Sequence, residues 1–320
     1  MPRQNHDDFI LLTGRANPEL SHAIGKILGV EVLEPISIFS DGEIRVRISK
    51  NLRRRMVFII QPTATPVNDH IMELLFMIDA AKRASASEIT AILPYYGYGR
   101  QDRKEMSRVP ISSSVVASSI ANAGADRIFT IDIHSEQQEG FVKKPWDNIY
   151  GSYSLLPAIK KKNLSNVVVA APDKGGMLQA TGYAKLLGVD EIALVYKKRD
   201  IMLNNVSNTL AMIGNVKDKD VLLVDDMIDT AGTIVNAANH IHKKGAKSVR
   251  VVATHGIFSG DALQKINSSA ISEVITTDTI SHRPEIRNSK KMTIVSVAPL
   301  IAEAIKRIKS GESISKDLIL

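Results

Sequence analysis

The stretch Val221-Leu-Leu-Val-Asp-Asp-Met-Ile-Asp-Thr-Ala-Gly-Thr233 decides the fold class of this chain. Its four apolar residues predict a buried strand, and Asp225 and Asp226 follow at the carboxyl end, where open α/β sheets bind ligands. Asp229–Thr233 then turns into a helix, whose N-terminus, small residues and hydroxyls suit a phosphate group. The acids suit ribose hydroxyls and Mg²⁺. The alternative is an N-capped helix with solvated carboxylates.

Outside this stretch, short β-branched runs alternate with amphipathic segments at helical spacing, which predicts parallel sheets flanked by helices. Val57–Gln61, with the helix and strand after it, resembles the unit that begins at Val221, so we expect two similar halves that meet near Pro145–Gly151. The predicted strands are Phe9–Leu12, Val57–Gln61, Ile89–Leu93, Ile128–Ile133, Val167–Ala171, Ile192–Tyr196, Val221–Val224, Val249–Thr254 and Val274–Thr276, and the predicted helices are Asn68–Ala84, Ser112–Ala123, Gly175–Leu187 and Thr233–Lys244.

The composition sets limits on the class of protein. With 320 residues, 44% of them hydrophobic and 23% charged, the chain is typical of a globular protein and long enough for two domains. A net charge of +7 favours a polyanionic ligand. Without cysteine there is no disulfide and no thiolate nucleophile or metal ligand. The sequence shows no signal peptide and no membrane-spanning run, so we expect a soluble cytoplasmic protein. It contains no Walker A or GxGxxG motif, which disfavours the nucleotide-binding folds that carry them.

A second motif, Pro94-Tyr-Tyr-Gly-Tyr-Gly-Arg-Gln-Asp-Arg-Lys104, follows a predicted strand. Arg100 and Arg103 suit phosphates because a guanidinium binds them through two donors. Gln101 and Asp102 suit the hydrogen-bonding edge of a base. A solvated basic loop is one alternative. Bases stacked on the tyrosines are another, disfavoured because aromatic residues make up only 5% of the chain.

Together these motifs resemble those of ribose-phosphate pyrophosphokinases, with Gly99 where alanine is usual. The resemblance extends from Thr13-Gly-Arg-Ala-Asn to the C-terminal serines and includes Phe39-Ser-Asp-Gly-Glu43, which in the family serves the adenine pocket of a neighbouring subunit. Phosphoribosyltransferases lack the Phe39 and Pro94 motifs. The resemblance implies ATP binding by Phe39, Asp41, Glu43, Arg100, Gln101, Asp102 and His134, and ribose 5-phosphate binding by Asp225, Asp226, Asp229, Thr230, Ala231, Gly232 and Thr233.

The resemblance also implies Mg²⁺ as the cofactor. The family positions that match His134, in Asp132-Ile-His-Ser135, and Asp173, in Pro172-Asp-Lys-Gly-Gly176, contact Mg²⁺. Taken alone, a single histidine is more often structural. Lys174 departs from the histidine usual in the family, and Gln179 lies where a basic residue is common.

Tyr196-Lys-Lys-Arg199 resembles the Asp-Lys-Arg-Arg sequence that opens the family's catalytic loop, with Tyr196 and Lys198 as departures. The resemblance assigns transition-state stabilisation to Lys197 and Arg199. The polar residues that follow, to about Val206, suit a closing lid. Without the resemblance, this basic run is an ordinary solvated segment.

The resemblance implies two phosphoribosyltransferase-type α/β domains, residues 1–147 and 148–304, with the tail 305–320 packed on the first. The implied enzyme is a ribose-phosphate diphosphokinase that transfers the diphosphoryl group of Mg-ATP to ribose 5-phosphate, as a homohexamer regulated by phosphate and ADP, without nucleic acid or membrane partners. A phosphoribosyltransferase and a non-catalytic regulatory paralogue remain alternatives. The expected regulatory phosphate site consists of Arg45, Arg47, Ser313 and Ser315.

Overall fold

The computed structural model describes residues 9–162, 164–199 and 208–314, which divide into two compact units. The first contains the described residues up to Tyr150, Thr279–Ser281 and those from Ser296 onward, and the second contains the described residues of Gly151–Asp278 and His282–Val295. Each unit has the mainly parallel sheet flanked by helices that the sequence predicts. The chain returns to the first unit at Ser296, and the domain limits 1–147 and 148–304 remain a proposal.

The first unit is built on a sheet whose strands run in the order β2-β1-β5-β6-β7-β8, all parallel. A separate antiparallel hairpin joins β3 to β4. Its elements are β1 (Phe9–Thr13), α1 (Pro18–Leu28), β2 (Val32–Leu33), β3 (Ile36–Ile38), β4 (Ile44–Val46), β5 (Met56–Ile60), α2 (Val67–Arg83), β6 (Glu88–Leu93), α3 (Ser112–Ala123), β7 (Arg127–Ile131), the 3₁₀ helix η1 (Glu136–Phe141), β8 (Trp146–Ile149) and α9 (Ala298–Ser310).

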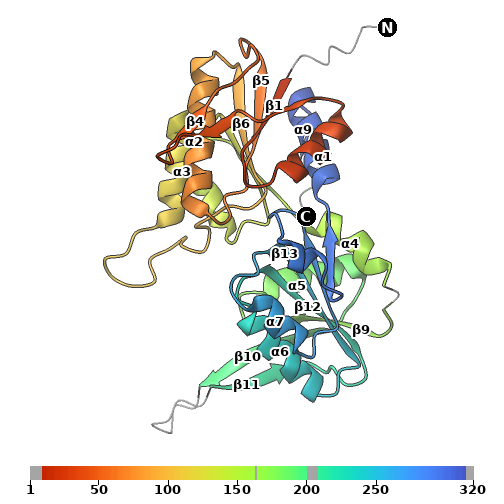
Figure 1. Ribbon diagram of the computed structural model, residues 1–320. Helices are drawn as coiled ribbons and strands as arrows, with labels where there is room; N and C mark the ends of the chain where they lie inside the picture. Colours follow the sequence, from red (N-terminus) through yellow and green to blue (C-terminus); the bar gives the residue numbers. More distant parts are fainter. Residues whose placement is uncertain (1–8, 163, 200–207, 315–320) are drawn as a thin grey trace. The chain divides into compact units, whose positions relative to one another are not determined.

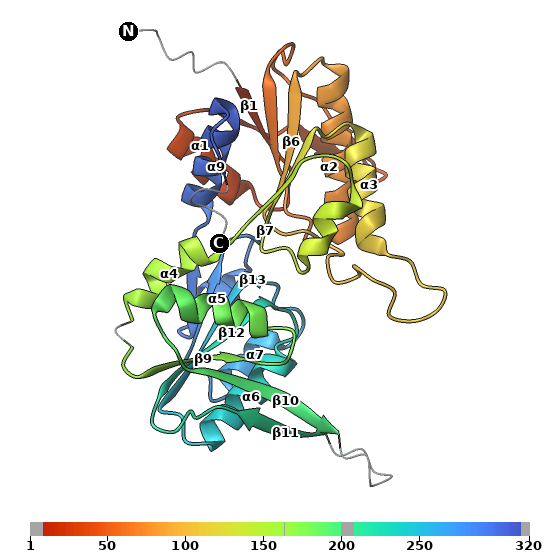
Figure 2. The ribbon, with the colours of Figure 1, turned by 180° about the vertical axis from the view of Figure 1, so that it is seen from behind.

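Helices cover both faces of this sheet, α2 and α3 on one side and α1 beside α9 on the other (Figures 1 and 2). Buried side chains of α2 and α3, such as Leu74 and Ile120, pack with strand residues such as Ile59 and Ile89. These apolar positions recur at helical spacing in the helices, while the strands are continuously apolar because both of their faces are covered.

The second unit has a sheet in the order β11-β10-β9-β12-β13-β14-β15, parallel except for the edge strand β11. Its elements are α4 (Ser152–Lys160), β9 (Val167–Ala171), α5 (Met177–Leu187), β10 (Ile192–Arg199), β11 (Asn208–Ile213), β12 (Asp220–Ile228), α6 (Gly232–Lys243), β13 (Ser248–Gly256), α7 (Ala262–Asn267), β14 (Glu273–Thr277), α8 (Pro284–Arg287) and β15 (Met292–Val295).

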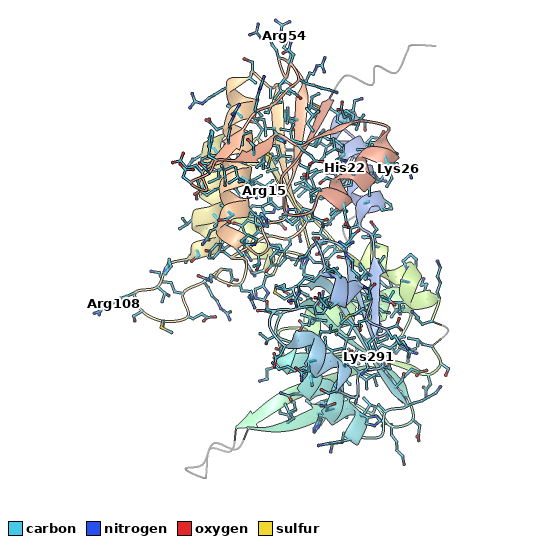
Figure 3. The ribbon with its side chains drawn as sticks, viewed as in Figure 1. Arg15, His22, Lys26, Arg54, Arg108 and Lys291 are labelled. Atoms are coloured by element: carbon cyan, nitrogen blue, oxygen red, sulfur yellow. The ribbon has the colours of Figure 1, made fainter. Side chains whose placement is uncertain are left out.

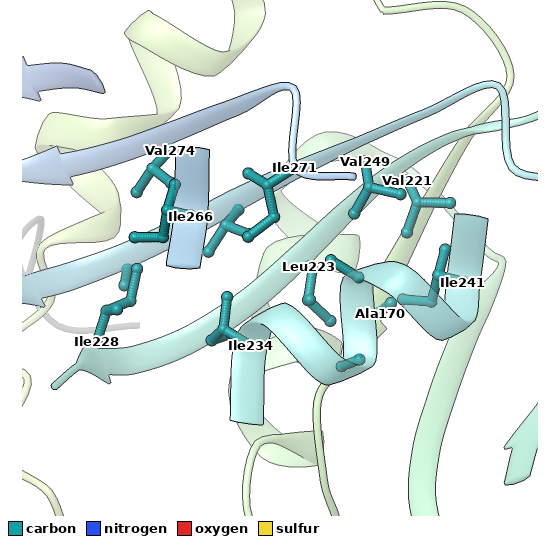
Figure 4. Packing of buried hydrophobic residues seen from close by; sticks show 14 of the residues in the cluster. Ala170, Val221, Leu223, Ile228, Ile234, Ile241, Val249, Ile266, Ile271 and Val274 are labelled. Carbon is teal, nitrogen blue, oxygen red and sulfur yellow. The ribbon is translucent and has the colours of Figure 1, made fainter. Parts of the chain in front are cut away.

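Two cores enclose the second sheet because successive strand residues face opposite sides. Leu223 and Val249 pack in one cluster with Ile234 of α6 and Ile266 of α7 (Figure 4), whereas Leu222 on the opposite face packs with residues of α4 and α5. Burial of each such side chain contributes about 1.5–3 kcal/mol relative to exposure. These cores hold the ends of β9 and β12 in place.

The faint internal repeat in the sequence corresponds to equivalent positions in the two sheets. The unit β5-α2-β6 lies next to β1, and the unit β12-α6-β13 lies next to β9. Both units link neighbouring parallel strands. Within the described ranges, no helix is long and apolar enough to cross a membrane.

Two predicted strands end too early by three residues or more. The strand predicted to end at Val224 continues to Ile228, because β12 pairs with β13 as far as Gly256. The strand predicted to end at Tyr196 continues to Arg199, because β11 pairs with it in antiparallel register. Both extensions depend on pairing with a neighbouring strand, and the local sequence does not show how far that pairing runs.

Candidate functional site

The second sheet has a topological switch point between β9 and β12. From β9 the chain passes to β10 on one side, and it later returns to β12 on the other side. Ligands of open α/β sheets bind outside the carboxyl ends of the strands at such a point. Because β9 and β12 are parallel neighbours, the segments after them, Pro172–Gly176 and Asp229–Thr233, lie at the same edge. The sequence predicted both segments as sites.

Asp225 and Asp226 lie within the extended part of β12 and are partly buried. The backbone N–H of Asp226 donates to Oδ1 of Asp225 at 3.0 Å. The pKa of the Asp225 carboxyl is raised to about 8, chiefly by burial and additionally by the charges of Asp226 and Asp173. A cation or hydroxyl donors would relieve this repulsion, so these carboxylates suit sugar hydroxyls and a hard metal ion.

Asp173 is exposed and orders the turn that leads into α5. Its Oδ1 accepts hydrogen bonds from the N–H groups of Gly175, at 2.8 Å, and Gly176, at 3.2 Å. Because its charge acts on Asp225, the two carboxylates share one electrostatic environment. Lys174 beside it is also exposed.

The segment Asp229–Thr233 joins β12 to α6 through a left-handed residue, Ala231, with φ +61°. No side chain caps the N-terminus of α6, so its first N–H groups can meet an anion. Thr230 and Thr233 are exposed there. The ammonium of Lys265, in α7, donates to the carbonyl of Thr230 at 3.3 Å. Sequence reasoning missed Lys265, which lies 35 residues from its partner.

In the first unit, Pro94–Lys104 follows β6 and begins the long connection to α3. Arg108, which is labelled in Figure 3, lies further along this connection. Arg100 and Gln101 are exposed. Tyr95 and Tyr96 are 8% and 5% exposed, so their rings cannot stack on nucleic-acid bases. A Cβ at Gly97 would lie 2.3 Å from the Thr63 carbonyl oxygen, which requires glycine there.

His134 is exposed and follows β7, the neighbour of β6, so it lies at the same edge of the sheet as the Pro94–Lys104 segment. No group of three or more histidine and acidic side chains that could hold a metal ion occurs among the described residues. Mg²⁺ usually keeps several waters and takes one or two protein ligands, so isolated ligands such as His134 and Asp173 still fit it.

Phe39 lies at the hairpin between β3 and β4, half exposed, with the guanidinium of Arg45 5.8 Å from its ring centroid. Its N–H donates to the Glu43 carbonyl at 2.9 Å, and the Asp41 carboxylate accepts the Glu43 N–H at 3.0 Å. Gly42 has φ +93°, a conformation that favours glycine. Asp41 therefore orders the turn that presents Phe39.

The other predicted residues are only partly described. The backbone of Lys197 and Arg199 belongs to β10, opposite Leu210 and Asn208 of β11, and their side chains and the segment 200–206 lie outside the described residues. Arg45 and Arg47 are exposed, and the carbonyl of Ser313 accepts a hydrogen bond from Arg307 at 3.1 Å. Ser315 lies outside the described part of the chain.

The chain is similar to known proteins along nearly all of its length. The family model of the N-terminal domain of ribose phosphate pyrophosphokinase matches residues 9–124, and that of the phosphoribosyl synthetase-associated domain matches 196–318. The ribose-phosphate pyrophosphokinases of Wolinella succinogenes and Vibrio parahaemolyticus are each 47% identical to it, over 96% of this chain and 98% of theirs.

A solved structure is similar throughout. The phosphoribosylpyrophosphate synthetase from Mycobacterium smegmatis matches with a TM-score of 0.88 and 38% identity, over 95% of this chain and 99% of that one. The match therefore includes both units.

Proposed function

The chain belongs to the ribose-phosphate pyrophosphokinase family, and on that premise we propose that it transfers the diphosphoryl group of Mg-ATP to the C1 hydroxyl of ribose 5-phosphate. The products are 5-phosphoribosyl 1-diphosphate and AMP. The observation that carries this proposal is the switch point between β9 and β12, where carboxylates lie beside an uncapped helix N-terminus.

Ribose 5-phosphate binds along the segment Asp225–Thr233. The carboxylates of Asp225 and Asp226 accept hydrogen bonds from the vicinal ribose hydroxyls, which offset the burial and the repulsion that together raise the pKa of Asp225. The 5-phosphate binds at Asp229–Thr233, where N–H groups and threonine hydroxyls donate to it. The hydrogen bond from the Lys265 ammonium to the Thr230 carbonyl helps to hold this segment in place.

ATP binds to Arg100, Gln101, Asp102 and His134, and Phe39 of a neighbouring subunit stacks on the adenine. Arg100 is exposed and the Phe39 ring is half exposed, which leaves both side chains open to a ligand and supports these roles. A planar guanidinium binds two phosphate oxygens at once, whereas an aromatic ring offers an apolar face to a base.

The reaction is an in-line displacement at the β-phosphorus of ATP by O1 of ribose 5-phosphate. AMP leaves, and no covalent enzyme intermediate is required. Lys197 and Arg199 neutralise the charge that develops on the transferred oxygens, which is the main task of a phosphoryl-transfer enzyme. His134 would hold Mg²⁺ on the ATP side, and Asp173 would hold Mg²⁺ beside the ribose hydroxyls and phosphates. The metal would supply charge neutralisation and acidify the sugar hydroxyl.

We also propose a cytoplasmic homohexamer regulated by phosphate and ADP, because in the family the adenine pocket and the regulatory site both lie across subunits. Arg45 and Arg47 donate to the regulatory anion together with Ser313 and Ser315. The exposed guanidinium groups on and after β4 support this role.

The deciding experiment mixes the protein with Mg-ATP and ribose 5-phosphate and measures AMP and phosphoribosyl diphosphate. Equal amounts of both products are expected. A phosphoribosyltransferase would instead consume phosphoribosyl diphosphate with no need for ATP, and a regulatory paralogue would bind both substrates without turnover.

A further inference from the structure

Gln138 is a buried amide at the junction of three segments of the first unit. It belongs to η1 and has no exposed surface. Its Nε2 donates to the carbonyl of Gly99 at 3.0 Å, and its Oε1 accepts from the hydroxyl of Ser113. Because a backbone carbonyl can only accept, the two bonds fix which end of the amide faces which segment.

These bonds hold the backbone around Arg100. Gly99 directly precedes Arg100, and Gln101 directly follows it. The carbonyl of Gln101 accepts the N–H of Ser113 at 3.2 Å, and its side-chain Oε1 accepts the hydroxyl of Ser112 at 2.6 Å. The segment is thus anchored to η1 on one side of Arg100 and to the first turn of α3 on the other.

Gln138 also connects with the segment that carries His134. Its own N–H donates to the carbonyl of Ser135 at 3.1 Å, one residue after His134. The backbone packs closely at Gly99, because a Cβ there would lie 3.1 Å from the Tyr96 carbonyl oxygen. A shift of Gln138 would therefore disturb both segments.

We propose that Gln138 is a positioning residue for ATP binding, which sets Arg100 and Gln101 relative to His134 through its bonds to Gly99 and Ser113. This inference rests on the proposed function for the identity of the ligand. Gln138 touches neither nucleotide nor metal in this role. It acts by keeping the two segments that bind ATP in one fixed arrangement, because buried amides with both ends satisfied rigidify their surroundings.

The test compares Gln138→Leu, which has similar size and neither polar group, with Gln137→Leu at the exposed neighbouring position. Calorimetry with Mg-ATP is expected to show the Kd rise about tenfold or more in Gln138→Leu, the scale of a lost hydrogen bond. Binding of ribose 5-phosphate should stay within about twofold. Gln137→Leu should leave both affinities near wild type.

A second variant separates positioning from simple loss of stability. Gln138→Leu with Ser113→Ala removes the hydroxyl that the single change leaves unpaired, so the Tm should recover while ATP affinity stays low. Recovery of ATP affinity together with the Tm would overturn the proposal. If Gln138→Leu fails to fold, Gln138→Asn, which keeps the amide but shortens its reach, takes its place with the same expected loss of ATP affinity.

Amide hydrogen exchange without any ligand makes the result independent of the proposed function. In Gln138→Leu, exchange in residues 96–104 should become faster than in wild type, while residues 221–233 stay unchanged. If the wild type neither binds ATP nor forms AMP but this exchange increases, the proposed function fails and Gln138 still holds the segment. Unchanged exchange with unchanged ATP affinity would overturn the role of Gln138 itself.

Discussion

The guanidinium of Arg15 donates from Nε to Oε1 of Glu73 at 2.6 Å, and the Glu73 side chain is fully buried. The other carboxylate oxygen accepts the N–H of Arg15 at 3.0 Å and the side-chain amide of Gln61 at 2.7 Å. All three residues lie at the ends of β1 and β5 or on α2, the switch point of the first sheet. At this switch point the buried carboxylate is neutralised and hydrogen-bonded by its neighbours. At the switch point of the second sheet, by contrast, the carboxylates of Asp225 and Asp226 repel each other.

Arg15→Ala should lower the free energy of unfolding by about 3 kcal/mol, because it leaves a buried carboxylate without its counter-charge. Urea unfolding measures this change. His22→Ala, which removes the exposed pair with Glu34, serves as the control and should cost less than about 1 kcal/mol. Equal losses in the two variants would show that the burial of Glu73 is unimportant.

Lys197→Ala and Arg199→Ala should each lower kcat about 10²–10³-fold with smaller changes in KM, because their contacts form mainly in the transition state. Steady-state assays of AMP formation measure both constants. Lys198→Ala, between the two on β10, is the matched control. Near wild-type turnover in both variants would remove the catalytic role proposed for this strand.

Asp225→Asn and Asp226→Asn should weaken ribose 5-phosphate binding about tenfold or more, whereas Mg-ATP binding should change less. An amide accepts fewer hydrogen bonds than a carboxylate and holds a hard cation poorly. Calorimetry with each ligand separately measures the effect. A defect confined to ATP would place the sugar elsewhere.

Asp225→Asn should also make the ligand-free protein more stable at pH 8. The folded-state pKa of Asp225 is raised from 3.8 to about 8, so the folded protein binds this proton more tightly than the unfolded chain. The free energy of unfolding therefore falls as pH rises between these values, and the asparagine variant escapes that loss. A gain of about 1 kcal/mol or more at pH 8 is expected.

The same variant should gain much less at pH 4, because that pH lies close to the unfolded-state pKa of 3.8 and little of the loss has yet developed. Thermal unfolding at the two pH values measures the difference, with the exposed Asp190→Asn as control. A gain of equal size at pH 4 would mean that charge burial is not its cause. Stability given up at a binding site is common, since such sites are arranged for ligands.

Assembly and regulation form the last prediction. Activity should reside in the hexamer and increase with inorganic phosphate, and Arg45→Ala or Arg47→Ala should weaken that activation. Gel filtration with light scattering, beside activity at several phosphate concentrations, measures both. A fully active monomer would contradict the assembly. A hexamer fully active without phosphate and unaffected by truncation at Gly311 would contradict the regulation.

Much of the fold could be predicted because apolar runs and helical spacing are local signals. Val167–Ala171 and Ser112–Ala123 were predicted with the observed ends. The short strands β3 and β4 were missed because their side chains are half or fully exposed and lack a clear apolar pattern. The edge strand β11 was missed because its position depends on pairing with β10.

The candidate site was predictable where one motif carries the chemistry, as in Asp225–Thr233. The residues that hold this motif and the ATP-binding segment in place could not be predicted from the sequence. Lys265 and Gln138 act on segments more than thirty residues away, through bonds that only the folded chain brings about. The raised pKa of Asp225 likewise comes chiefly from its burial in the folded chain, with a smaller part from the charge of Asp173, which follows another strand.

The return of the chain to the first unit sets the order in which the protein can fold during synthesis. α9 packs beside α1, and its buried residues include Leu300 and Ile305. These residues leave the ribosome after every strand of the second sheet. The first unit is therefore completed only after the whole second sheet has been made, and the surface of α1 that α9 covers stays open to chaperones until then.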